Sequence, residues 1–398
     1  MSAESAARAH QAELILMQSR PESSVGRTLA VLHPAFALTG VLQAIGGPLL
    51  PSIAATFHLS DSQSGLLFFL YFAGTALGVF FCRENYARAI TLGYVAMAAC
   101  CIGVAVATRP LLPPVFLLLG ISVGIPMSGV SLYVGRAFVE KRAPMLTFLN
   151  FSWSAGALVA PLLAAPILVH HTYRFAYVLL AFVAGAAAIC CALFVRDAYE
   201  APRKVTQTQR LASVRLILVF ALAAFLQVGI ENTAATWLST YSFRATGASV
   251  VLAAASTSLY WGGFLASRGL SSLLLLRTAP VYVFRAAVAV ALAAAVLLAA
   301  ASSPAIRSLA MLLLGIALAP IYPLVIAGFF ARAHHTSQSR WVLATAGFGG
   351  SVLPWLAGWI STHTGSLRMG ILTIPVALAI MVLVLPSISA SPTTASEN

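Results

Sequence analysis

The sequence predicts an all-α polytopic membrane protein with twelve transmembrane helices in two six-helix bundles. Three observations favour this fold class: a shortage of charge, a series of apolar segments of membrane length, and an internal repeat. Of the 398 residues, 60% are hydrophobic and only 8% are charged, whereas about 25% of a soluble domain is charged. The composition therefore excludes a soluble enzyme, a nucleic-acid-binding protein and a disordered chain, even though the formal net charge is +13.

The apolar segments have the length that a bilayer requires. A hydrocarbon core of about 30 Å is crossed by a helix of about 20 apolar residues. Dividing the sequence at Pro, Gly, Ser and charge clusters gives twelve such segments, near 30–53, 62–82, 88–107, 113–137, 144–169, 174–195, 213–240, 249–267, 279–301, 305–331, 340–362 and 367–386. The stretch between the eighth and ninth segments is itself mostly apolar, so their division is the least sharply marked.

The basic residues give the orientation. With the N-terminus inside, 18 of the 23 Lys and Arg fall on the inner side and 5 on the outer side. No outer loop then has more than one basic residue, and Arg268 counts as an inner residue just after the eighth segment. Because cytoplasmic loops carry the excess of Lys and Arg, both termini are predicted to be cytoplasmic.

A polar stretch after the sixth segment divides the chain into two halves. We expect a cytoplasmic tail over 1–28, a six-helix half over 29–196, a cytoplasmic linker over 197–212, a second six-helix half over 213–386 and a tail over 387–398. The first 28 residues are polar and lack the apolar core of a secretory signal peptide. The five cysteines lie in or beside apolar runs, which argues against a disulfide framework.

The two halves repeat each other. Matching strings occur in order, at offsets of 184 to 195 residues: FALTGVLQ (36–43) with FALAAFLQ (220–227), LGI (119–121) with LGI (314–316), and GALVAP (156–161) with GGSVLP (349–354). The repeat indicates two parallel halves. In transporters built in this way, the substrate site lies near the bilayer midplane, where the halves meet.

The segment from Gly78 to Arg88 resembles the signature loop of the major facilitator superfamily, Gly-x-x-x-Asp-Arg-x-Gly-Arg-Arg. Gly78, Arg83 and Arg88 match this pattern, while Cys82 stands at the Asp position. The resemblance implies that Gly78, Arg83 and Arg88 take part in conformational gating. A short basic turn that only follows the positive-inside rule is the alternative explanation.

Longer strings are similar to the fucose–galactose–glucose/H⁺ symporter family, and most to its glucose/mannose branch. They are PLLPSIAATFHLSDSQSGLL (48–67), GIENTAATWLSTY (229–241), LAPIYPLVIAG (318–328) and GGSVLPWLAG (349–358). The resemblance implies a secondary transporter for a hexose such as glucose or mannose. It also implies symport with a proton.

Glu231 is the only acidic residue well inside a predicted span; Asp61 begins the second span beside Ser60, as a helix cap. A charge at membrane depth costs about 2.5 kcal/mol or more on insertion scales, so burial favours a protonated carboxyl group. Such a group can carry a proton, and Glu231 is therefore predicted to be the coupling residue. A protonated Glu that serves only helix packing is the alternative.

The fucose branch has carboxylates that align with Gly47 and Gly124, and neither is present in this chain. Either Glu231 couples a proton alone, or the protein is a facilitator, or another ion is used. A sugar site also needs hydrogen-bonding groups and aromatic faces. The candidates at suitable depth are Gln43, Asn150, Trp153, Gln227, Glu231, Asn232, Tyr260, Tyr322 and Trp355. Interhelical packing and the interfacial aromatic belt are the alternatives for these residues, and the belt is favoured for Trp237 near a span end.

The sequence thus predicts a multi-pass protein of the cell (plasma or inner) membrane that is not an enzyme and moves a small polar solute by alternating access. Its expected partners are the solute, protons and the lipid bilayer, with no nucleic acid, cofactor or metal, and we expect a monomer. The alternatives are an exporter or facilitator of another small organic or amphiphilic compound, and a sugar sensor of the same fold.

Overall fold

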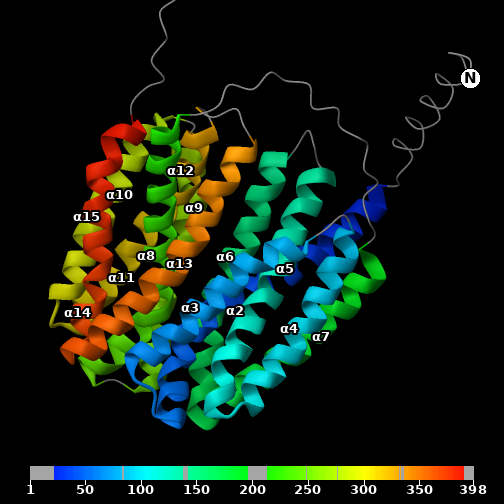
Figure 1. Ribbon diagram of the computed structural model, residues 1–398, viewed down its shortest axis with the longest axis horizontal. Helices are drawn as coiled ribbons and strands as arrows, with labels where there is room; N and C mark the ends of the chain where they lie inside the picture. The colour runs from blue at the N-terminus through cyan, green and yellow to red at the C-terminus, as the bar shows by residue number, and fades with distance from the viewer. Residues whose placement is uncertain are drawn as a thin grey trace, which may run out of the picture.

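The computed structural model describes residues 22–82, 85–137, 142–195, 213–247, 249–275, 277–330, 332 and 336–389. Apart from turns, these residues form helices (Figure 1). The helices of the first half are α2 (Glu22–Phe57), α3 (Asp61–Gly78), η1 (Val79–Phe81), α4 (Tyr86–Val106), η2 (Arg109–Leu111), α5 (Leu112–Ala137), α6 (Arg142–His170) and α7 (Tyr173–Phe194). Those of the second half are α8 (Val214–Thr246), α9 (Val250–Leu274), α10 (Pro280–Ala300), α11 (Pro304–Leu318), α12 (Ile321–Phe330), α13 (Thr336–Thr364), α14 (Leu367–Ile371) and α15 (Thr373–Ser389).

Each of the twelve predicted segments coincides with one helix or with two consecutive ones. Within the described residues, ten of them are long and apolar enough to cross a membrane. The remaining two are α9 and α13, which contain more polar residues. The helical membrane fold is therefore confirmed, while the count of twelve spans and the cytoplasmic side of the termini stay predictions.

Some helices are longer than the predicted segments, since α2 begins at Glu22 rather than near 30 and α8 ends at Thr246 rather than near 240, and three further differences follow. The eighth segment was placed at 249–267, but α9 continues to Leu274 because the residues after Arg268 are mostly apolar and helix-compatible. Two segments predicted as single helices are broken, between α11 and α12 and between α14 and α15. Pro320, Pro323 and Pro375 lie at these breaks, and proline cannot donate the backbone hydrogen bond that a continuous helix needs.

The helices form two groups, α2–α7 and α8–α15, which stand side by side in Figure 1. The described chain ends, at the start of α2 and the end of α15, lie at the same end of the molecule (Figure 1). We call this the tail end, and the opposite end, which holds the α2–α3 and α8–α9 turns, the far end. The tail end is the one that the basic residues assign to the cytoplasm.

Glycines at repeat-equivalent positions show that the two halves are packed alike. A methyl group at Gly120 would collide with the carbonyl oxygen of Tyr71, and one at Gly315 would collide with that of Tyr260. These contacts join α5 to α3 and α11 to α9. Because only glycine permits such close approach of helix backbones, the repeat seen in the sequence is also present in the packing.

Candidate functional site

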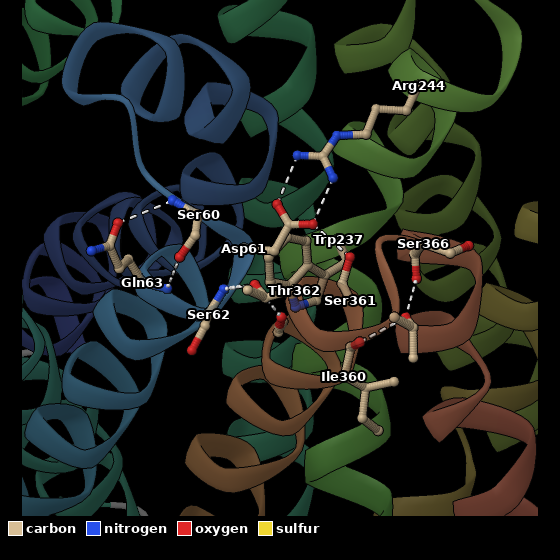
Figure 2. A network of polar contacts seen from close by, with 12 residues as sticks. Ser60, Asp61, Ser62, Gln63, Trp237, Arg244, Ile360, Ser361, Thr362 and Ser366 are labelled. Carbon is tan, nitrogen blue, oxygen red and sulfur yellow. Dashed lines mark hydrogen bonds and ion pairs between the residues drawn. The ribbon is translucent and has the colours of Figure 1, made fainter.

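An ion pair joins the two halves at the far end. Arg244 of α8 donates from its two terminal nitrogens to the two carboxylate oxygens of Asp61, at 2.6 and 2.7 Å (Figure 2). The Asp61 side chain is 11% exposed and that of Arg244 is 44% exposed. Charge-assisted bidentate bonds of this kind fix orientation as well as adding energy. Asp61 therefore has a second role beside that of a helix-start residue.

Helix α13 adds hydrogen bonds to this ion pair. We call the residues that take part, Asp61, Ser62, Arg244, Ser361 and Thr362, the closing network. The Ser361 hydroxyl donates to Asp61 at 2.5 Å, and the Ser62 backbone N–H donates to the Thr362 hydroxyl at 2.8 Å (Figure 2). Ser60 and Gln63 form the reciprocal capping box that starts α3, as Figure 2 also shows. The start of α3 is thus held by its own cap and by two helices of the other half.

A pocket of about 240 Å³ lies between α2, α3 and α8, and Asp61 and Arg244 are among the residues that line it. Ser64 and Thr240 line it, and their hydroxyl groups are buried without a hydrogen-bond partner among the described residues. Trp237 also lines it. The expectation that Trp237 belongs to an interfacial belt is wrong: it is fully buried and donates its indole N–H to the Pro354 carbonyl at 2.8 Å.

Close helix packing also joins the two halves. Along the far half of the molecule α2 meets α8, where a methyl group at Gly47 would collide with the Ala235 carbonyl oxygen. Helices α3 and α13 touch where Gly65 lies against the backbone of Trp355. Among the described residues, no comparable packing joins α5 to α12 near the tail end. Contacts between the halves nevertheless continue toward the tail end, where Arg268 of α9 donates to Asn150 and Ser154 of α6 and a methyl group at Gly347 of α13 would lie 3.1 Å from the Ala76 side chain.

Glu231 lies midway along α8, and Arg268 of α9 is the charged group that interacts with it electrostatically. The Glu231 carboxylate has no hydrogen-bond partner among the described residues. Tyr260 of α9 and Tyr322 of α12 lie within electrostatic range of the same two groups. An acid, a base and two phenols thus interact electrostatically inside the protein.

Aromatic rings from both halves surround these charges. Trp153 of α6 makes an edge-to-face contact with Trp261 of α9, with ring centroids 5.7 Å apart. Trp261 packs in the same manner on Tyr260 at 5.0 Å. Together with Glu231, Arg268 and Tyr322, these three rings form what we call the central cluster: Trp153, Glu231, Tyr260, Trp261, Arg268 and Tyr322.

The structure brings four of the predicted substrate-binding residues into this cluster: Trp153, Glu231, Tyr260 and Tyr322. Asn150 lies next to it, but its side-chain amide donates to the Leu146 carbonyl of its own helix at 2.9 Å. Its backbone carbonyl, in contrast, accepts from Arg268. Trp355 is not in the cluster and packs edge-on against Phe69 of α3 at 6.4 Å.

The predicted amides have interhelical contacts. The Gln227 amide donates to the Leu318 carbonyl at 3.0 Å, at the break between α11 and α12. The Asn232 amide donates to the Gly350 carbonyl of α13 at 3.3 Å. The side-chain oxygens of Gln43 and Gln227 are buried without a partner among the described residues. Asn232 thus contributes to helix packing, whereas the side-chain oxygens of Gln43 and Gln227 can still accept a hydrogen bond from a substrate.

Of the predicted gating residues, Gly78 packs against the backbone of Gly124 in α5, inside the first half. Arg88 is exposed in the first turn of α4. Its backbone N–H donates to the side-chain oxygen of Asn85, the N-cap residue, at 2.8 Å. Arg83 lies outside the described residues. Nothing in these contacts tests the gating role, which stays a prediction.

Sequence reasoning missed two features of this arrangement. Arg268 was counted as a charge beyond the eighth span, whereas it lies inside α9 with six further helical residues after it. Arg244 was counted as an outer-loop base, and its pairing with Asp61 was not foreseen. A signal for the second was present, since Asp61 is the one acid assigned to the outer side, opposite five bases.

Comparison with known proteins agrees with this architecture. The family model of the Major Facilitator Superfamily matches residues 32–340. The glucose/galactose transporter of Brucella abortus biovar 1 (strain 9-941) is 24% identical over 379 residues, covering 87% of this chain and 91% of the relative.

Two solved structures share the fold. A bacterial homolog of the human lysosomal transporter Spinster, inward-facing and unoccupied, has a TM-score of 0.74 at 16% identity, covering 94% of this chain and 100% of that one. The transporter FucP, in the outward conformation, has a TM-score of 0.63 at 19% identity, covering 91% and 98%. With a family model that spans most of the sequence, and a repeated helical fold that matches these structures, the chain belongs to the major facilitator superfamily, a family of membrane transport proteins.

Proposed function

We propose that this protein is a secondary transporter that moves a hexose such as glucose or mannose by alternating access, in symport with a proton carried by Glu231. The observation that carries the proposal is the central cluster, in which a carboxyl group midway along α8 interacts electrostatically with Arg268, Tyr260 and Tyr322, next to a contact between Trp153 and Trp261 that joins the halves. The similarity to a glucose/galactose transporter supports the substrate class.

The chemistry of the cluster suits a neutral polyhydroxylated solute. Glu231 and Arg268 carry opposite charges, so a charged substrate gains no net attraction from the pair. The side-chain oxygen of Gln43, the indole N–H of Trp153 and the hydroxyl of Tyr260 are buried without partners among the described residues. Donors and acceptors of this kind can pair with sugar hydroxyls, and aromatic faces can cover the ring.

The closing network belongs to one of the two states of the transport cycle, the state in which the far end is closed. Asp61 and Arg244 hold the far end shut, so access to the central cluster from that side requires their separation. We expect twelve spans with both termini in the cytoplasm, a monomeric protein, and residence in the plasma or inner membrane. With that orientation, the far end faces the outside of the cell.

Uptake of labelled hexoses into proteoliposomes tests the proposal. An imposed inward proton gradient should drive accumulation of at least one hexose above its external concentration, and collapse of the gradient should release it. Exchange without accumulation contradicts symport and supports facilitated transport. If no hexose in the panel is taken up or exchanged, the sugar assignment fails.

A further inference from the structure

The Arg268 guanidinium is enclosed by aromatic rings. Its central carbon lies 4.6 Å from the ring centre of Phe264 and 5.6 Å from that of Trp153. A cation removed from water needs compensation, which ring faces supply in part. Its Nε atom is buried without a hydrogen-bond partner among the described residues. A buried guanidinium in this position therefore needs hydrogen-bond acceptors and a negative charge nearby.

Arg268 finds its hydrogen bonds in the other half. Its Nη1 atom donates to the Ser154 hydroxyl at 2.8 Å and to the Asn150 carbonyl at 3.3 Å, both on α6. Since α6 belongs to the first half and α9 to the second, this side chain spans the interface between them. Charge-assisted bonds are about twice as strong as neutral ones.

The compensating charge comes from α8. The groups that interact electrostatically with Arg268 are Glu231, Tyr260 and Tyr322. A phenol is neutral at pH 7 because its ordinary pKa is about 10, so Glu231 is the one among these three that can supply a negative charge. Arg268 therefore interacts electrostatically with an acid in its own half and donates hydrogen bonds to acceptors in the other.

We propose that Arg268 is the counter-charge of Glu231 and the positioning residue that links the state of this carboxylate to α6; the inference rests on the proposed role of Glu231. While Glu231 is ionised, it attracts the guanidinium toward α8. Once Glu231 is protonated this attraction is lost, and the guanidinium keeps its hydrogen bonds to Ser154 and Asn150 and its contacts with the aromatic rings. Protonation thereby changes how firmly α9 is tied to the other half.

A double-mutant cycle on thermal stability tests the counter-charge without any transport assay. Glu231→Gln and Arg268→Gln are made singly and together, and unfolding is followed in detergent. Each single change leaves one buried charge uncompensated. The double variant should therefore unfold at least about 3 °C above the temperature that adding the two single shifts gives. Additive shifts overturn the inference.

The pH profile of hexose uptake tests the link to the carboxylate. A carboxyl group that loses a neighbouring positive charge holds its proton more tightly, so Arg268→Gln should move the midpoint of the uptake profile upward by about one pH unit. Arg268→Lys keeps the charge and should keep the midpoint. Ser154→Ala, which removes one of the two α6 hydrogen bonds of Arg268 and no charge, should keep it as well.

The outcomes separate this inference from the proposed function. If Arg268→Gln lowers uptake at every pH without moving the midpoint, Arg268 is merely structural and the link is overturned. A wild type whose uptake is independent of pH contradicts proton coupling instead. In that case the stability cycle still decides whether Arg268 and Glu231 are counter-charges.

Discussion

Arg244 and Asp61 are 183 residues apart in the chain and form a bidentate ion pair across the two halves at the far end. The Ser361 hydroxyl donates to the same carboxylate, so three helices from two bundles converge on one side chain. The Arg244 side chain is 44% exposed, so its Coulomb energy is reduced by solvent. We therefore assign the pair about 1 kcal/mol.

Neutralising this pair should open the far end. Asp61→Asn removes the charge but keeps the size, and a loss of about 1 kcal/mol shifts the balance between closed and open states roughly five-fold. The rate at which an impermeant maleimide modifies a cysteine placed at Ser64, a buried pocket residue, should rise accordingly. This measurement is made in a background without the five native cysteines.

The matched control exchanges the two charges. Asp61→Arg combined with Arg244→Asp restores an ion pair in the reverse direction and should bring the labelling rate back toward that of the parent. If the exchange variant labels as fast as Asp61→Asn, the pair does not hold the far end closed.

Glu231→Gln should separate exchange from accumulation. A glutamine keeps hydrogen-bonding capacity but carries no transferable proton, so hexose exchange between equal pools should persist. Accumulation driven by a proton gradient should fall by an order of magnitude or more. Both are measured in proteoliposomes with the same protein content, and Glu22→Gln at the start of α2 serves as a control. Equal pH dependence in Glu231→Gln and wild type would remove the role given to this residue.

Gly315→Ala should destabilise the second half. The added methyl group would collide with the Tyr260 carbonyl oxygen, and overpacking of this kind costs about 1–3 kcal/mol. The unfolding temperature in detergent should fall by roughly 3 °C or more. Gly185→Ala is the control, because a methyl group there meets no atom within 4 Å and helix propensity favours alanine by up to about 1 kcal/mol. Equal effects of the two changes contradict the close packing.

Gln227→Met should loosen the break between α11 and α12. The change removes the fully buried amide that donates to the Leu318 carbonyl at 3.0 Å and leaves that carbonyl without its side-chain donor. Loss of one partner of a buried hydrogen bond costs about 1–3 kcal/mol. Hydrogen exchange measured by mass spectrometry should become faster in the peptide covering 314–330 and stay unchanged in the peptide covering 112–130 of the first half.

The fold could be predicted from the sequence because its determinants are local. The length of each apolar segment predicts a helix. Repeats such as LGI at 119–121 and 314–316 show which helices of the two halves correspond. Breaks at Pro320 and Pro375 were not predicted, since proline occurs inside other helices of this chain, for example Pro126 and Pro161, without ending them. Whether a proline breaks a helix depends on the packing around it.

The candidate site could be predicted only in part. Glu231 was identified because a carboxyl group within an apolar span is conspicuous on its own. Arg268 was missed because its depth depends on how far α9 continues, and RGLSSLL (268–274) is compatible with either a loop or a last helical turn. The pairing of Asp61 with Arg244 depends on the approach of two bundles, which no single segment encodes.

The interruption between α11 and α12 has a mechanical consequence. Tyr322 is the second residue of α12, a ten-residue segment, and lies near Glu231. A change in a few backbone angles at Ala319 and Pro320 would reorient α12 and move the Tyr322 phenol toward or away from the Glu231 carboxyl group. Helix α11 would stay packed against α9. The hydrogen bond from the Gln227 amide to the Leu318 carbonyl, next to this break, would then favour one orientation of α12 over others.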